Sequence, residues 1–250
     1  MFRQSIKNKA LFFKSATALG CSFGVQALFL NCAFAEDTKK TRVFSWGASQ
    51  YFQTGLGRNK GVYSPEPVSF FDDVAIADIQ AGGQQTFVLA KDGKVYSFGR
   101  GDDGRLGHGG EANEVLPRVV ESLLGTKIAS LSCGEKHVAA VTEDGDLYTW
   151  GRGHSGQLGR DPSDLPRKVP GMANIKAVSC GKFHTVAVDS SGRVFSCGEG
   201  RSAALGHGDR DSREQFELVG NLKDVKITDV AAGEDFSLFL SEDGRLFSCG

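Results

Sequence analysis

The sequence lacks the short motifs that mark several common enzyme and metal sites. From Val43 onward it contains no G-x-S-x-G nucleophile elbow, and the whole chain contains no G-x-x-x-x-G-K-S/T phosphate-binding loop. Its six cysteines form no C-x-x-C pair and stand at no zinc-like spacing from histidine. We therefore expect no covalent catalysis, no metal and no other cofactor.

Net charge and a basic tail are also missing. The 29 Lys and Arg residues nearly balance the 30 Asp and Glu residues, so the formal net charge is −1 at pH 7. Such a chain has no general positive field that would attract a polyanion. We therefore expect no nucleic-acid partner.

Glycine is present in excess, with 33 residues in 250, about twice the usual share. The glycines follow a repeat. The stretch Glu143–Gly159, EDGDLYTWGRGHSGQLG, returns as KDGKVYSFGRGDDGRLG at Lys91–Gly107 and as SSGRVFSCGEGRSAALG at Ser190–Gly206. The glycines that end the aromatic segment step by 52, 52, 47 and 52 residues, at Gly47, Gly99, Gly151, Gly198 and Gly250.

Each repeat unit contains segments that favour about four short strands. His137–Val141 is a short, partly β-branched apolar run, which is typical of a strand and too short for a helix. A D-G or S-G pair and a second apolar run follow, which predicts a hairpin whose glycine takes positive φ. Ile128–Leu131 predicts a third strand, and Leu116–Val119 a fourth at an edge, where proline is tolerated. Four strands in roughly fifty residues are typical of a propeller blade.

This alternation of CG, H, DG, W/FG and LG resembles the regulator-of-chromosome-condensation repeat, whose family folds as a seven-bladed β-propeller. Gln85 and Phe236 stand where His137 and His184 stand in other units, and these departures leave the fold assignment intact. We therefore expect an all-β propeller of four-stranded blades of about 50 residues. The expected units are about 43–93, 94–145, 146–192 and 193–244, with the start of a fifth at 245–250.

The length of the repeat region bears on closure of the ring. Residues 43–250 number 208, whereas seven such blades need roughly 360 residues. We expect a fragment or open arc with about four of seven blades. A small closed ring of four units stays open as an alternative.

The first 35 residues are of a different kind, with four basic residues and no acidic one. On a helix, Arg3, Lys7 and Lys14 would form a cationic stripe beside apolar residues, which is typical of a mitochondrial presequence. The uncharged run at 15–35 ends in Ala-Phe-Ala, which also matches a secretory cleavage site, and its length just suffices to cross a bilayer.

We therefore predict a targeting leader at residues 1–35 and a linker at 36–42. The expected location is mitochondrial, with inner-membrane association through residues 15–35 as one option. Secretion stays open as the alternative.

The residues that recur with the period are interpreted as structural. A residue repeated in every blade usually serves each blade alike, and does not converge with its copies on one site. Trp150 and four histidines, His108, His137, His184 and His207, fall in this class, whereas His154 is interpreted as a surface residue of a turn. The positions expected to be structural are Gly82, Gly93, Gly99, Gly107, Gly134, His137, Gly145, Trp150, Gly151, Gly159, Gly181, His184, Gly192, Gly198, Gly206, Gly233, Gly244 and Gly250.

What remains is surface recognition by the segments that vary between units, residues 58–75, 108–127, 160–174 and 207–226. We predict a non-enzymatic scaffold for protein–protein binding. The family resemblance implies two narrower roles, guanine-nucleotide exchange on a small GTPase or mitochondrial assembly, although the inserted hairpin of known exchange factors is not evident in these units. The alternative is a secreted propeller that binds an extracellular protein or ligand.

Overall fold

The computed structural model describes residues 42–250. The predicted leader, with its apolar run at 15–35, and the linker up to residue 41 lie outside the described residues. Within residues 42–250, no helix is long and apolar enough to span a membrane.

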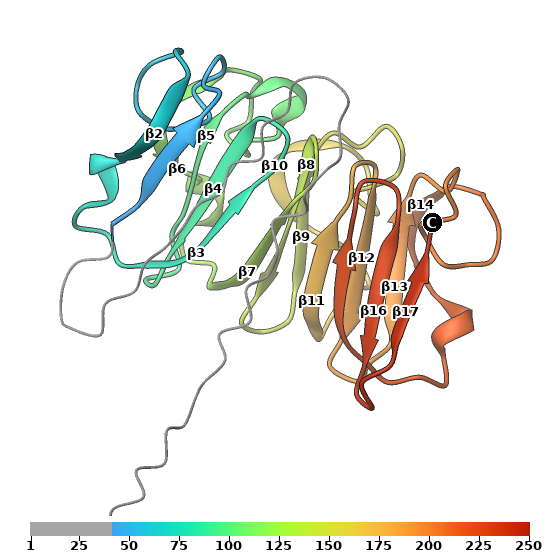
Figure 1. Cartoon of the computed structure of the whole chain (residues 1–250). Coiled ribbons are helices and arrows are strands. Elements are labelled where there is room, and N and C mark those ends of the chain that lie inside the picture. The colour runs from blue at the N-terminus through green and yellow to red at the C-terminus, as the bar shows by residue number, and fades with distance from the viewer. Residues whose placement is uncertain (1–41) are drawn as a thin grey trace, which may run out of the picture.

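Five antiparallel sheets follow one another along an arc, from blue to red in Figure 1. We number them blades 1 to 5 in chain order. Blades 2, 3 and 4 have four strands each, whereas blade 1 has two and blade 5 has three among the described residues. The expectation of an all-β propeller with four-stranded blades is confirmed.

The strand bounds repeat from blade to blade. Blade 1 contains β1 (Phe44–Gly47) and β2 (Val62–Pro67), and blade 2 contains β3 (Ile76–Ala81), β4 (Gln85–Ala90), β5 (Val95–Gly99) and β6 (Glu114–Val119). Blade 3 contains β7 (Ile128–Cys133), β8 (His137–Thr142), β9 (Leu147–Gly151) and β10 (Ser163–Lys168), and blade 4 contains β11 (Ile175–Cys180), β12 (His184–Asp189), β13 (Val194–Gly198) and β14 (Arg213–Leu218). Blade 5 contains β15 (Ile227–Ala232), β16 (Ser237–Ser241) and β17 (Leu246–Cys249). Single 3-10 turns lie at Ser69–Phe71, Asp102–Gly104, Glu121–Leu123 and Gly220–Leu222.

The strand order within each blade follows the chain. The first strands of neighbouring blades contact one another, as β7, β11 and β15 do, so they form the inner side of the arc. The last strands, β6, β10 and β14, form the outer edges. Each predicted sequence unit therefore supplies the two outer strands of one blade and the two inner strands of the next.

Burial explains the apolar runs seen in the sequence. Every residue of β4, β8 and β12 is buried, because a neighbouring blade covers each face of the sheet. The core accordingly lies between blades. Phe87 of blade 2 packs edge-on against Trp150 of blade 3, with ring centroids 5.8 Å apart.

The hairpin glycines behave as the sequence predicts. The φ angles of Gly93, Gly145, Gly192 and Gly244 lie between 82° and 88°, a backbone conformation that residues with a side chain rarely adopt. A second glycine series serves another purpose, because it has ordinary φ and lies where blades meet. A Cβ on Gly134 would lie 2.5 Å from the carbonyl oxygen of Gly181, and one on Gly181 would lie 2.6 Å from that of Gly233.

The same close approach joins Gly82 to the carbonyl oxygen of Gly134. The backbone of each blade thus touches the backbone of the next at a point where no side chain fits. We call this row of four residues, Gly82, Gly134, Gly181 and Gly233, the glycine seam.

Replacing Gly134 by alanine should lower the free energy of unfolding by about 1–3 kcal/mol, because the added methyl group forces two blades apart. Gly110→Ala is the matched control, since a Cβ there meets nothing within 4 Å, and its effect should stay within about 0.5 kcal/mol. Urea denaturation measures both. Equal stability of the two variants would show that the seam tolerates a side chain.

Candidate protein-binding face

The connections between strands lie on two opposite faces of the arc. The loop face carries the connection from the first strand to the second and the long loop from the third strand to the fourth. In blades 2 and 3 these are residues 82–84, 100–113, 134–136 and 152–162. The turn face carries the hairpin turns, such as residues 91–94, and the connections between blades.

A charged cluster on the loop face joins blade 2 to blade 3. Arg105 has a side chain only 1% exposed, and its Nη2 donates to Asp102 Oδ2 at 2.8 Å. The same Nη2 lies 3.4 Å from Asp103 Oδ2. From blade 3, Lys136 Nζ donates to Asp103 Oδ2 at 3.2 Å. The buried Arg105 guanidinium therefore holds the carboxylates of Asp102 and Asp103 where blade 2 meets blade 3.

Asp103 is fixed by its backbone as well. Its φ of 60° and ψ of 16° place it in the left-handed region, which costs a non-glycine residue about 1 kcal/mol or more. Burial would raise the pKa of the Asp103 carboxyl, but the hydrogen bond from Lys136 and the charges of Lys136 and Arg105 outweigh it and lower the pKa. The carboxylate is thus held in its charged form.

Neighbouring side chains on this face are also held. The Arg100 guanidinium lies 4.5 Å from the centre of the Tyr51 ring, and that of Arg152 lies 5.7 Å from the Phe183 ring. Lys182 pairs with Glu234 across the boundary between blades 4 and 5.

Three ion pairs of the turn face are more exposed to solvent than the charged cluster of the loop face. In the pairs Lys94–Asp92, Lys226–Glu242 and Arg245–Asp243, the exposed fraction of every side chain is 48% or more. In the Asp102, Asp103, Arg105 and Lys136 cluster it is 33% or less. The cluster is therefore less exposed than these three pairs, although Asp189 in the turn-face pair Arg193–Asp189 is also buried.

The predicted structural histidines lie beneath the loop face, between blades. His137 Nε2 lies 2.9 Å from Thr185 Oγ1 of the next blade. Because Thr185 Oγ1 donates its proton to the carbonyl oxygen of Gln157 at 2.7 Å, His137 Nε2 must be the donor. His184 and Ser237 repeat the arrangement at 2.9 Å. The position facing Gln85 is Val138, which offers no hydroxyl, and Gln85 Nε2 donates instead to the Gly134 carbonyl at 3.0 Å.

A related set of donors ties each blade to the long loop of the blade before it. The carbonyl oxygen of Gln53 accepts from Thr86 Oγ1 at 2.8 Å, and that of Ala204 accepts from Ser237 Oγ at 2.8 Å. In blade 3 the residue equivalent to Thr86 and Ser237 is Val138, which has no hydroxyl to donate. The indole Nε1 of Trp150 donates in its place, 3.0 Å from the carbonyl oxygen of Arg105. The tryptophan that the sequence singled out therefore compensates for a valine.

Comparison with known proteins agrees with this architecture. Residues 41–89, 92–141, 144–188 and 191–240 match the regulator of chromosome condensation (RCC1) repeat. The chain belongs to the RCC1 repeat family. The four matches cover most of residues 42–250.

Several proteins with RCC1 repeats resemble this chain in sequence. The mitochondrial RCC1 domain-containing protein RUG3 of Arabidopsis thaliana is 34% identical over 139 residues, which are 56% of this chain and 29% of RUG3. The ultraviolet-B receptor UVR8 of the same plant is 31% identical over 169 residues, 65% of this chain and 38% of UVR8. The E3 ubiquitin-protein ligase HERC2 of Homo sapiens is 37% identical over 114 residues, 46% of this chain and 2% of HERC2. The chain thus spans less than two fifths of each of these relatives.

Two solved structures share the fold. Human WBSCR16 superposes with a TM-score of 0.73 at 23% identity, covering 85% of this chain and 57% of WBSCR16. Prp20p of Saccharomyces cerevisiae, described with its binding properties to Gsp1p and histones, gives a TM-score of 0.55 at 23% identity, covering 86% of this chain and 67% of Prp20p.

The variable segments of these RCC1 repeats are not simple loops. Each of residues 58–75, 108–127, 160–174 and 207–226 contains the outer strand of a blade, namely β2, β6, β10 or β14. Their sequence variation therefore falls on the outer rim as well as on the two faces.

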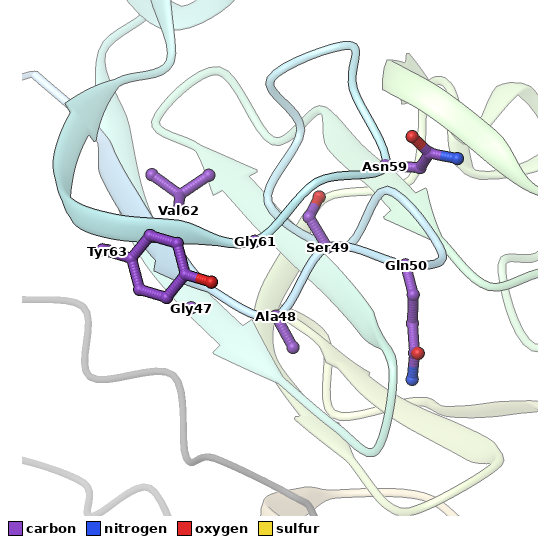
Figure 2. Close-up of a pocket in the computed structure, with 8 residues that line it drawn as sticks. All are labelled: Gly47, Ala48, Ser49, Gln50, Asn59, Gly61, Val62 and Tyr63. Atoms are coloured by element: carbon purple, nitrogen blue, oxygen red, sulfur yellow. The ribbon is translucent and has the colours of Figure 1, made fainter.

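A cavity of about 270 Å³ opens beside blade 1, and Figure 2 shows the residues that line it. Its polar side chains do not converge, since Gln50 and Asn59 point in different directions, and no Asp, Glu, Lys, Arg or His lines it. Within residues 42–250, no group of three His, Cys, Asp or Glu side chains is placed to hold a metal ion. The cysteines in this range, Cys133, Cys180, Cys197 and Cys249, are free thiols.

Trp150→Phe should lower the free energy of unfolding by about 1–3 kcal/mol, because the buried Arg105 carbonyl loses its donor. Adding Val138→Thr should recover part of that loss, since it recreates the Thr86 and Phe98 pair of blade 2. Chemical denaturation of the two variants tests this. A double variant no more stable than Trp150→Phe would contradict the compensation.

Acid should weaken this propeller through its buried histidines. Burial lowers the pKa of His137 to about 3, with a further contribution from His184, and burial lowers the pKa of His184 to about 4. Both stay neutral in the folded state, so as the pH falls below about 6.5 the unfolded chain binds protons that the folded chain excludes, and stability falls.

Each histidine should contribute a slope of up to about 1.4 kcal/mol per pH unit between pH 6 and 4.5. Urea unfolding at several pH values should show a shallower decline for His184→Gln than for the wild type, because glutamine does not titrate. Parallel declines would show that this histidine does not titrate on unfolding.

Proposed function

We propose that the chain is a non-enzymatic, protein-binding propeller whose loop face recognises a polar surface of its partner. The observation that supports this most strongly is the ordered charge cluster of Asp102, Asp103, Arg105 and Lys136. Its members are held by a buried guanidinium, by a left-handed backbone and by two adjacent blades.

Order before binding favours affinity. A side chain immobilised at an interface usually costs about 0.5–1.5 kcal/mol of entropy, and this cluster has already met that cost in folding. Charges of both signs lie side by side, so the partner surface should carry a complementary mixed pattern, which gives orientation and specificity more than raw affinity. The exposed turn-face pairs Lys94–Asp92, Lys226–Glu242 and Arg245–Asp243 offer less of this advantage.

At a finer level, we propose that the partner is a small GTPase and that the protein acts as a guanine-nucleotide exchange factor. The shared fold with Prp20p, described with binding to Gsp1p, supports this. Exchange would require the loop face to bind the nucleotide-free state more tightly than the loaded state. That is differential binding and needs no covalent step.

For the destination we propose the mitochondrion. The basic, acid-free leader supports this, as does the similarity to the mitochondrial protein RUG3. A GTPase or an assembly factor of that organelle is therefore the first partner to test.

The test uses the full chain as bait in a mitochondrial extract, followed by calorimetry with each purified partner. Lys136→Gln should weaken binding by about tenfold or more, as expected for a truncated interface charge. Lys94→Gln, which removes the same charge from the turn face, is the matched control and should change affinity less than about twofold.

Equal affinities for the wild type and both variants would contradict recognition by the loop face. Release of a fluorescent GDP analogue from a bound GTPase tests the finer proposal separately. Binding without accelerated release would overturn exchange activity and leave the binding role in place.

A further inference from the structure

A second cavity lies on the outer rim, where blade 3 meets blade 4, and has a volume of about 330 Å³. Met172, in the connection between blades 3 and 4, and Phe195 and Phe216 of blade 4 give it apolar walls, and Arg160 lies beside them. We call this site the Arg160 groove. It is separate from the charge cluster of the loop face, because it lies against the outer strand β14.

Arg160 differs from its counterparts in the other units. The residue after each Leu-Gly pair is Arg58, His108, Arg160 or His207. Arg58 pairs with Glu66, His108 Nε2 lies 2.9 Å from Ser97 Oγ, and His207 Nε2 lies 3.0 Å from Ser196 Oγ. Arg160 has no ion-pair partner within residues 42–250, although its Nη1 is buried and without a hydrogen bond.

A buried guanidinium nitrogen without an acceptor is costly, because it has lost its hydrogen bond to water. Burial lowers the pKa of Arg160 and outweighs the charge of Asp161, which favours the charged form of Arg160. The flat fork of arginine matches a carboxylate, which can accept two of its protons. Asp161 lines the same groove. A singly charged carboxylate therefore suits the site better than a doubly charged phosphate, which the Asp161 charge would repel more strongly.

Gln215 and Phe216 of the edge strand β14 line the groove, so a polypeptide can approach it along that edge. β14 is the last strand of its sheet, so one side of its backbone is unpaired within the described blade. Gly159 lies directly against the Phe216 ring, where a side chain would not fit. The rings of Phe195 and Phe216 also line the groove, where they offer apolar walls.

We propose that the Arg160 groove binds an extended acidic segment of a partner protein. One carboxylate of the segment pairs with Arg160, and an apolar side chain two residues away, on the same side of the extended segment, packs against Phe195 and Phe216. The groove adds a peptide-binding site on the rim to the recognition surface of the loop face.

Fluorescent, end-capped octapeptides provide the probe. Each has Glu followed two residues later by Leu, in a background of Ser and Ala varied at the other positions, and each has a twin with Gln in place of Glu. For the wild-type chain, anisotropy should show Glu peptides binding about tenfold or more tightly than their twins, as a charge-assisted pair predicts.

Arg160→Gln should abolish this preference, and Arg160→Lys should keep only part of it, because lysine retains the charge without the fork. Arg58→Gln is the matched control at the equivalent position and should leave the preference intact. Thermal unfolding of each variant checks that it folds. The proposal is overturned if no Glu peptide outbinds its twin, or if Arg58→Gln removes the preference as fully as Arg160→Gln.

Discussion

The direct contact between the backbones of adjacent blades is the constraint on which the rest of the structure depends. At Gly134 and Gly181 the next blade comes so close that even a methyl group would collide with a carbonyl oxygen. This approach brings His137 within reach of Thr185 and Trp150 within reach of the Arg105 carbonyl. Burial of the second strand of each blade on both faces follows from the same geometry.

The close contacts between blades also position the charged side chains of the loop face. Arg105 is buried where two blades meet, so the Asp102 and Asp103 carboxylates that pair with it are held close to the packed core. The blades share one architecture but differ in their polar contacts. Where one blade lacks a hydrogen-bond donor, another side chain at the same boundary between blades supplies it. Val138 and Trp150 show this most clearly. A scaffold of this kind can vary its exposed charges while its internal contacts stay satisfied.

The sequence predicted the family, the propeller and the hairpin turns correctly, because each rests on a short local pattern that recurs about every fifty residues. It marked Gly134 and Trp150 as structural without their reasons, since their partners belong to a different unit of the chain. The sequence did not reveal the Arg105 cluster, because its residues do not recur with the repeat. Arg160 was seen only as part of a variable segment, because its missing partner is apparent only when the other three blades are compared in three dimensions.

Hydrogen exchange of the free protein tests the central claim, that the loop face is ordered before any partner binds. Backbone hydrogen bonds hold this loop, including those from the amide of Arg100 to the Gln84 carbonyl and from the amide of Gly107 to the Gly104 carbonyl, at 2.9 and 3.0 Å. We predict that amides at 100–107 exchange nearly as slowly as those of β5, and that Gly134→Ala accelerates them. Exchange at the rate of an unstructured peptide in the wild type would contradict the account.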